Sequence, residues 1–296
     1  MTRITWMARQ VGLILIFSAF SGTCFSKDTV TWLEYELPPG YISSGSNERQ
    51  GFANKSIQWL QQQLPQWQHH TKIATIPRLL VMARMKQDVC SCILKNPERE
   101  ATLHFSAPIM QLSPHRLFFL TKNKAELEAK LGMPLNQQVS LATIMEHLDK
   151  VSFSVASGRS YGASRDAILN QHHDEIQVST QSKLSSQFIS RLVANRLDFI
   201  IEYPWLITYE QSQMGFKERT LSSVAIEESA PMLDVYIACA KTANGAQVIE
   251  SINQNRIQAS CKKETSTFKR KIFFPSSRSS STVTMRSSSA SWCPML

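Results

Sequence analysis

Apolar segments of strand length alternate with segments of helical periodicity along most of this chain, and this alternation limits the available folds more than any other feature. Val30–Tyr35 and Val89–Leu94 are short apolar runs that predict strands. Between them, apolar residues recur at helical spacing from Phe52 to Leu64, and Pro65 follows directly. Such alternation is typical of α/β proteins, in which ligand sites lie at the carboxyl ends of the strands.

The alternation restarts after a first set of elements. Helical segments at Glu126–Leu131 and Leu141–Leu148 precede a predicted strand at Val151–Val155, and the apolar strand Phe199–Ile201 completes the second set. Elements spread over the roughly 235 residues from 27 to 261 are more than a single sheet usually holds.

We therefore predict two lobes, each with its own sheet. Lobe 1 is expected to comprise residues 27–120 and 225–261, and lobe 2 residues 121–224. The last strand and helix, Val235–Cys239 and Ala246–Ile257, are expected to return to lobe 1 because they have no partner sheet of their own.

Residues 1–26 have the pattern of a secretory signal peptide. Arg3 and Arg9 precede the apolar run Val11–Phe20, and small residues follow. This run is shorter than the ~20 apolar residues that cross a bilayer as a helix. We expect cleavage near residue 26 and a periplasmic mature chain, with lipidation at Cys24 as an alternative.

The net charge of +9 is concentrated at the two ends of the chain. Residues 1–26 hold two basic residues, and residues 262–296 hold seven basic residues and one acidic residue, which leaves residues 27–261 with a net charge of +1. Phosphate-backbone binding requires a basic stripe, and none occurs in residues 27–261, so nucleic acid is not an expected partner.

The C-terminal segment differs in composition from the rest of the chain. Residues 262–296 contain ten serines and no helical or strand periodicity, and we expect this basic tail to be disordered. The change after Asn255 is abrupt, and an alternative explanation is a shifted reading frame.

Four cysteines fall within the predicted lobes, at positions 90, 92, 239 and 261. Cys90 and Cys92 alternate along one predicted strand and point to the same face, which is poor geometry for a bond between them. We expect buried thiols, although an exported protein also permits disulfides. No ligand spacing of the zinc type accompanies them, so we expect neither a metal nor another cofactor.

Arg99 is the strongest candidate for a binding residue. It ends the run Asn96-Pro97-Glu98-Arg99, which follows a predicted strand and begins a predicted helix. The planar guanidinium of arginine can hold a carboxylate through two parallel hydrogen bonds. The alternative is that Arg99 pairs with Glu98 or Glu100 on a solvated helix face.

These residues carry a resemblance to a known family. The chain from Trp32 to about Ile257 resembles the bacterial extracellular solute-binding proteins of family 3, receptors that deliver amino acids and similar polar solutes to ABC importers. Asn96–Arg99 with Phe105–Pro108 resembles the family's Thr-Pro-Glu-Arg to Phe-Ser-Pro-Tyr block, whose arginine holds a ligand carboxylate. Ser157–Ser160 lies where the family places a glycine-serine turn, and Asn195–Asp198 resembles its Gly-Arg-Xaa-Asp segment.

The resemblance is to an uncharacterised branch that opens with a segment such as Trp32–Gly40. It implies a two-lobed α/β fold of the type II periplasmic-binding-protein kind, with a ligand cleft between the lobes. It also implies a monomer that binds a small carboxylate-bearing, amino acid-like solute and hands it to ABC importer membrane subunits. A sensor that reports to a membrane partner would use the same fold. A third alternative is an exported enzyme, a dehydratase of a cyclic carboxylate with Glu202 as general acid.

The candidate ligand-binding residues follow from the motifs and from the strand ends, and no catalytic set is expected. They are Arg99, Asn96, Trp32, Tyr35, Gly158, Ser160, Tyr161, Glu202 and Tyr203. Backbone N–H groups of residues 158–161, at a helix N-terminus, are expected to donate to the ligand anion. The resemblance places an acidic residue for a ligand ammonium group near Tyr203, but the acid in this chain, Glu202, stands one position earlier.

Overall fold

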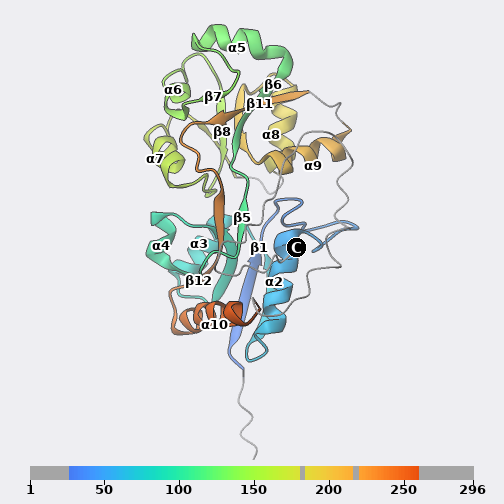
Figure 1. Cartoon of the computed structure of the whole chain (residues 1–296), viewed down its shortest axis with the longest axis vertical. Coiled ribbons are helices and arrows are strands. Elements are labelled where there is room, and N and C mark those ends of the chain that lie inside the picture. Colours follow the sequence, from blue (N-terminus) through green and yellow to red (C-terminus); the bar gives the residue numbers. More distant parts are fainter. Residues whose placement is uncertain (1–26, 181–183, 216–219, 260–296) are drawn as a thin grey trace, which may run out of the picture.

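The chain folds into two lobes, each built around a six-stranded sheet. The computed structural model describes residues 27–180, 184–215 and 220–259, and the expected signal peptide and C-terminal tail lie outside these ranges. The lobes lie one above the other along the long axis of the molecule, with lobe 2 at the top of Figure 1. The expected two-lobed α/β architecture is confirmed.

Lobe 1 contains a mixed sheet with strand order β2-β1-β3-β12-β4, and β5 also pairs with β12. Its strands are β1 (Thr29–Glu34), β2 (Gln68–Ile73), β3 (Val89–Leu94), β4 (Leu103–Phe105), β5 (Met110–Leu112) and β12 (Leu233–Ala240). Its helices are α2 (Phe52–Gln63), α3 (Ile76–Arg84), α4 (Pro97–Thr102) and α10 (Ala243–Ala259). Every residue of β3 is buried, as expected for a central strand with both faces covered.

Lobe 2 contains a second mixed sheet, with strand order β7-β11-β6-β10-β8-β9. Its strands are β6 (Arg116–Leu120), β7 (Gln138–Val139), β8 (Phe153–Ala156), β9 (Gln177–Ser179), β10 (Phe199–Glu202) and β11 (Leu221–Ile226). Its helices are α5 (Lys124–Leu131), α6 (Leu141–Met145), α7 (Ala163–Gln171), α8 (Leu184–Val193) and α9 (Pro204–Met214), with a short 3₁₀ helix, η1 (Thr121–Asn123), before α5.

The chain crosses between the lobes twice, from β5 to β6 through residues 113–115 and from β11 to β12 through residues 227–232. β6 pairs antiparallel with β10 and with β11, so residues 116–120 lie in lobe 2 and not in lobe 1, where the sequence placed them. The first boundary therefore falls before β6. β12 pairs with β3, which brings the last strand back to lobe 1.

His115 occupies the first of these crossovers and is almost completely buried. Its ring lies 3.8 Å from the ring of Tyr203 and 5.1 Å from that of Tyr161, both in lobe 2. Burial, together with the nearby Arg165 and Arg159 guanidinium groups, holds the pKa of His115 well below its ordinary value. The crossover is thus built around a neutral imidazole.

The cysteines differ from the sequence expectation. Cys90 and Cys239 are direct partners in the antiparallel pairing of β3 with β12, and a disulfide joins them. Cys92 is a buried free thiol, and Cys261 lies outside the described residues. The default expectation of a buried thiol was wrong for Cys90 and Cys239, because strand periodicity shows which face a side chain takes but not which strand lies beside it.

The disulfide is expected to contribute substantially to stability. It closes a loop between residues 149 positions apart, and disulfides of this kind contribute about 2–4 kcal/mol. We predict that Cys90→Ala/Cys239→Ala lowers the free energy of unfolding by about that amount in urea titrations. Dithiothreitol should shift the wild-type transition but not that of the double variant. Equal wild-type stability with and without reductant would contradict this prediction.

The buried His115 predicts a specific dependence of stability on pH. In the unfolded chain a histidine takes up a proton below about pH 6.5, whereas folded His115 stays neutral, so stability falls as the pH drops. Between pH 7.5 and 5, His115 should lower the free energy of unfolding by at most about 2 kcal/mol, the amount lost when the folded ring takes up no proton. We expect His115→Phe to lose less stability than wild type over this range. A pH dependence that is identical in the two proteins would contradict the prediction.

Candidate functional site

The candidate site lies where strand ends of the two lobes meet. Tyr35 follows β1 and Asn96 follows β3 in lobe 1, while the loop of residues 157–162 follows β8 and Tyr203 follows β10 in lobe 2. Within each lobe these strands run parallel to one another, either directly paired or as next neighbours. The carboxyl ends of these parallel strands, in both lobes, therefore lie at the boundary between the lobes.

Arg99 is positioned at this boundary by the start of α4. Asn96 is the N-cap residue, and its side-chain oxygen accepts a hydrogen bond from the Arg99 backbone N–H at 2.9 Å. The Arg99 side chain is buried and donates to the Leu94 carbonyl at 2.6 Å and to the Gly158 carbonyl of lobe 2 at 2.7 Å. The alternative of a solvated Arg99 paired with Glu98 or Glu100 is therefore excluded.

Both hydrogen bonds go to uncharged carbonyl oxygens, so the positive charge of the Arg99 guanidinium has no carboxylate partner in the described part of the chain. The group carries five N–H donors, and no ion pair of Arg99 occurs among the described residues. Burial lowers the pKa of Arg99, as expected for a cation that has lost water without gaining a full countercharge. Such a group is well suited to hold an anion.

The loop of residues 157–162 does not present its backbone donors as expected. The Tyr161 N–H donates to the Asp166 carboxylate at 2.6 Å, and the Arg159 N–H donates to the Ala156 carbonyl at 3.2 Å. Gly158 contributes its carbonyl to Arg99. The expectation that the N–H groups of residues 158–161 bind the ligand anion is therefore wrong for residues 159 and 161, because Asp166 and Ala156 already accept from them.

Asp166 connects this loop to lobe 1. Its carboxylate accepts from the Ser160 hydroxyl at 2.5 Å and from the side-chain amide of Asn96 at 3.0 Å. Asn96 and Ser160, both predicted ligand-binding residues, therefore lie together at the boundary, where each contacts Asp166. Asp166 was not among the predicted site residues, because only the fold shows that it faces back toward its own loop.

Gly158 lies against lobe 1. Its φ of +68° lies in the left-handed region, and a Cβ placed there would lie 2.9 Å from Cγ of Pro77 at the start of α3. A side chain at residue 158 would therefore push the two lobes apart.

Glu202 ends β10 and is completely buried. It forms an ion pair with Arg159, and its other oxygen accepts from the Tyr203 backbone N–H at 3.0 Å. Burial acts to lower the pKa of Arg159, but the Glu202 carboxylate outweighs this, so the pKa of Arg159 is raised. Arg159 was not among the predicted site residues, although it belongs to the Ser157–Ser160 motif.

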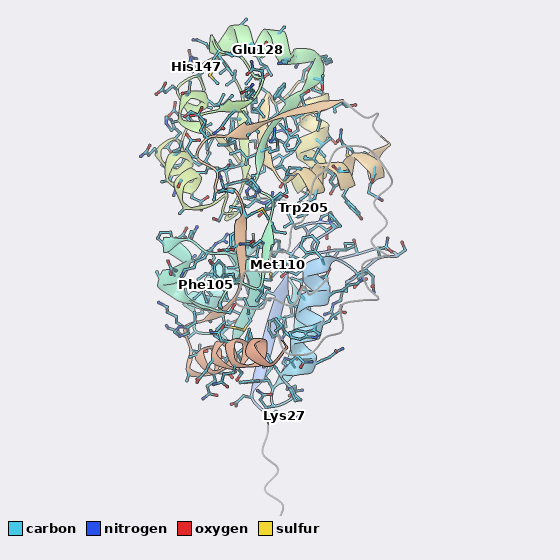
Figure 2. The ribbon with its side chains drawn as sticks, in the orientation of Figure 1. Lys27, Phe105, Met110, Glu128, His147 and Trp205 are labelled. Carbon is cyan, nitrogen blue, oxygen red and sulfur yellow. A yellow bond between two sulfur atoms is a disulfide. The ribbon has the colours of Figure 1, made fainter. Side chains whose placement is uncertain are left out.

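Aromatic side chains pack along the same boundary. Tyr203 stacks on Trp205 with ring centroids 4.7 Å apart, and Trp205 meets Phe52 of lobe 1 edge-on at 5.3 Å. Figure 2 shows Trp205 at the edge of lobe 2 that faces lobe 1, above Met110. On the lobe 1 side, the Tyr35 hydroxyl donates to the Cys92 carbonyl at 3.3 Å. Burial raises the pKa of Tyr35 and of Tyr203, so both phenols are neutral.

Two predicted residues have structural positions instead. Trp32 is completely buried in the core of lobe 1, where its indole N–H donates to Nδ1 of His69 at 3.0 Å. Trp32 is therefore not a boundary residue, because it lies in the middle of β1 and not at its end. The Tyr161 hydroxyl accepts from the Ala156 N–H at 3.0 Å and closes its own loop.

Arg165, on α7, is a second buried arginine that sequence reasoning missed. It donates to the Tyr161 carbonyl, and to the Glu228 carbonyl and the Ser229 hydroxyl in the second crossover. All of these acceptors are uncharged. Arg165 thus ties the loop after β8 to the segment that returns to lobe 1.

We refer to these side chains together as the boundary site. It comprises Tyr35, Asn96, Arg99, His115, Arg159, Arg165, Asp166, Glu202, Tyr203 and Trp205. Its three arginines exceed its two carboxylates by one positive charge when His115 is neutral. Because most of these side chains are buried against one another, ligand entry requires the lobes to separate.

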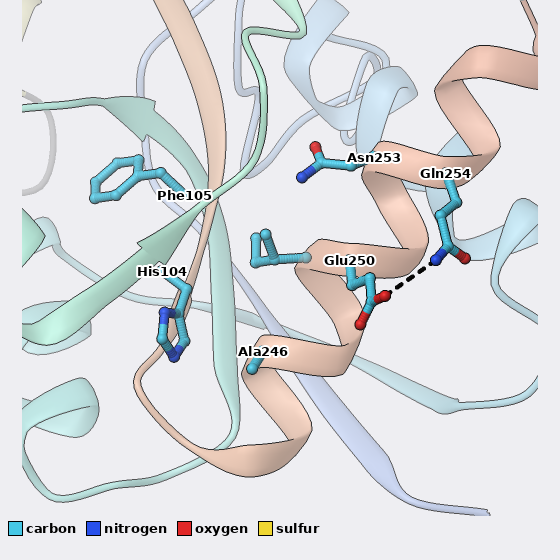
Figure 3. A pocket seen from close by; sticks show the side chains of 7 residues that line it. His104, Phe105, Ala246, Glu250, Asn253 and Gln254 are labelled. Atoms are coloured by element: carbon cyan, nitrogen blue, oxygen red, sulfur yellow. Dashed lines mark hydrogen bonds between the residues drawn. The ribbon is translucent and has the colours of Figure 1, made fainter.

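A separate pocket of about 460 Å³ lies on lobe 1, away from the boundary site. Figure 3 shows it between β4 and α10, with His104 and Phe105 on one side and Glu250 and Asn253 on the other. It contains no arginine or lysine that would hold a carboxylate. We do not assign the ligand to it.

Within the described ranges 27–180, 184–215 and 220–259, no three side chains of His, Cys, Asp or Glu come together as a metal site. In the same part of the chain, no helix is long and apolar enough to pass through a membrane.

Comparison with known proteins identifies the fold. No family model matches this chain, and no curated protein matches it in sequence. A mutant of ArgBP from T. maritima matches with a TM-score of 0.57 and 15% identity, over 79% of this chain and 90% of that chain. A putative L-cystine ABC transporter from Listeria monocytogenes matches with a TM-score of 0.56 and 18% identity, over 79% and 92%.

A histidine kinase sensor domain with similarity to periplasmic binding proteins also matches, with a TM-score of 0.58 and 10% identity, over 77% of this chain and 88% of that chain. At these identities the likeness concerns the fold. The chain has the two-lobed α/β fold of type II periplasmic binding proteins, and it matches amino-acid-binding proteins of solute-binding family 3 over most of its length.

Proposed function

We propose that this protein is an exported receptor that holds a small carboxylate-bearing solute between its lobes, with Arg99 as the principal carboxylate-binding residue. The observation that carries the proposal is the buried Arg99 guanidinium, which hydrogen-bonds one carbonyl from each lobe and has no carboxylate partner in the described part of the chain. A ligand carboxylate in place of the Gly158 carbonyl would give this cation a full countercharge.

The remaining boundary residues support a hinged receptor. Asn96 and Asp166 hydrogen-bond across the boundary, and Phe52 packs on Trp205 across it. Both contacts form only when the lobes are together, so they favour the closed state that buries a ligand. The Cys90–Cys239 disulfide is consistent with an extracytoplasmic location, which the proposed signal peptide in residues 1–26 would provide.

Delivery to an ABC importer is the role we propose for the captured solute. The matched structures include a putative L-cystine ABC transporter and an amino acid ABC transporter substrate-binding protein bound to L-arginine. A sensor role is the second candidate, because a histidine kinase sensor domain matches over a similar share of this chain. Both roles use the same closure around a ligand.

The enzymatic alternative has little support at the boundary site. It requires Glu202 to donate a proton, but the Glu202 carboxylate is ion-paired with Arg159 and accepts from the Tyr203 N–H. We therefore propose binding and not turnover.

Substitution of Arg99 tests the proposal. At a hundredfold excess over Kd a ligand adds about 2.7 kcal/mol of stability, or roughly 5–10 °C in Tm for a protein of this size. We predict such a shift for residues 27–261 with at least one small carboxylate. Arg99→Lys keeps the charge but loses the planar fork, and it should reduce the shift to less than half.

Arg84→Ala is the matched control, because Arg84 is an exposed arginine of the same lobe. It should retain the full ligand-induced shift. A folded Arg99→Lys protein that binds as tightly as the Arg84→Ala protein would contradict the proposed role of Arg99.

Closure of the lobes can be tested at Gly158. A methyl group at this position meets Pro77, so Gly158→Ala should weaken ligand affinity at least about tenfold by opposing the closed state. Gly132→Ala is matched for backbone strain, since Gly132 has a φ of +65° but nothing within 4 Å of the added methyl group. Isothermal titration calorimetry should show weakened binding for Gly158→Ala alone. Equal affinities of the two variants would argue against closure at this contact.

A further inference from the structure

The carboxylates at the boundary between the lobes are all engaged by donors of the protein itself. Glu202 is held by the Arg159 guanidinium and the Tyr203 N–H. Asp166 accepts from Asn96, from Ser160 and from the Tyr161 N–H. A ligand ammonium group that enters this region would compete with these donors for the carboxylate oxygens.

Glu34, at the end of β1, is engaged in the same way. It lies next to Tyr35 and is buried, and it binds Arg49 at 3.3 Å and the Asn54 amide at 2.8 Å. The negative charge of Glu34 is therefore already neutralised by Arg49.

The buried polar atoms of the boundary site that lack a hydrogen-bond partner are mainly donors. The indole N–H of Trp205 is buried and unbonded, as are both ring nitrogens of His115. Trp205 can only donate, and neutral His115 donates from one nitrogen and accepts at the other. The His115 ring packs against Tyr203 at 3.8 Å with a tilt of 30°, and Trp205 stacks on Tyr203 at 4.7 Å, so both unused groups adjoin Tyr203. Donors without partners match oxygen acceptors on a ligand.

The charges at the boundary site also favour an anionic ligand. Arg99 and Arg165 hydrogen-bond to carbonyl and hydroxyl oxygens, and neither forms an ion pair in the described ranges. With Arg159 neutralised by Glu202, the boundary site has an excess of positive charge that a single carboxylate would balance. An ammonium group on the same ligand would cancel the carboxylate charge and restore that excess.

We infer that the boundary site binds a monoanionic carboxylate with a second oxygen acceptor, such as a 2-hydroxy or 2-keto acid, in preference to a zwitterionic amino acid. This inference rests on the proposed function and specifies its ligand class. In this assignment Arg99 binds the carboxylate, an N–H of Trp205 or His115 donates to the second oxygen, and Glu202 stays paired with Arg159.

Matched ligand pairs test this directly. Each pair consists of an L-amino acid and the 2-hydroxy acid with the same side chain: alanine and lactate, leucine and 2-hydroxyisocaproate, phenylalanine and phenyllactate. Isothermal titration calorimetry on residues 27–261 should give at least about tenfold tighter binding for the hydroxy acid within the pair that binds best. Equal or tighter binding of the amino acid overturns the inference.

Two variants test whether the Arg159–Glu202 ion pair sets the preference for the hydroxy acid. Arg159→Met removes the guanidinium and leaves Glu202 to accept from an ammonium group, so the preference for the hydroxy acid should narrow or reverse. The double variant Arg159→Met/Glu202→Gln has no acid there and should retain the preference. It also guards against misfolding, because it removes the buried negative charge of Glu202 together with the Arg159 cation. An unchanged preference in a folded Arg159→Met protein overturns the role of the ion pair.

The inference and the proposed function fail in different ways. If amino acids bind more tightly and binding depends on Arg99, the receptor stands and the ligand class is wrong. If no member of any pair binds to folded wild-type protein and a panel of dicarboxylates and cyclic carboxylates also fails, the proposed carboxylate receptor itself is wrong.

Discussion

The structure depends on one buried cation, the guanidinium of Arg99, at the boundary of two lobes. A buried cation without a countercharge is tolerated only when hydrogen bonds surround it, and here one carbonyl from each lobe provides them. The same arrangement leaves donors unused, so the interaction that holds the lobes together is also the one that a ligand carboxylate would replace. The Arg99 guanidinium therefore binds either the Gly158 carbonyl, which joins the lobes, or a ligand carboxylate.

An ion pair at the same boundary limits what the site can bind. Arg159 and Glu202 neutralise each other beside the aromatic stack of Tyr203 and Trp205. Glu202 alone would offer an acid to an ammonium group, whereas the paired Glu202 does not. A single arginine in the loop after β8 therefore moves the preference of this boundary from zwitterions toward anions, without any change in the surrounding fold.

Much of the fold was predictable from the sequence, because short apolar runs mark β1, β3, β8 and β10 clearly. Helix α9 was missed, since its apolar residues do not fall on one face. Of the site residues, Arg99 and Asn96 were found through a local motif. Arg159, Arg165 and His115 were not, because their roles arise from contacts between segments 40 or more residues apart, such as Arg159 with Glu202. The Cys90–Cys239 pair was missed for the same reason.

The most direct test of carboxylate binding by Arg99 is a crystal structure of residues 27–261 with the tightest-binding carboxylate. We predict that the ligand carboxylate lies within hydrogen-bonding distance of the Arg99 guanidinium, between the lobes, with Arg159 still paired to Glu202. A ligand bound elsewhere, for example in the pocket between β4 and α10, with the Arg99 contacts to Leu94 and Gly158 unchanged, would contradict it.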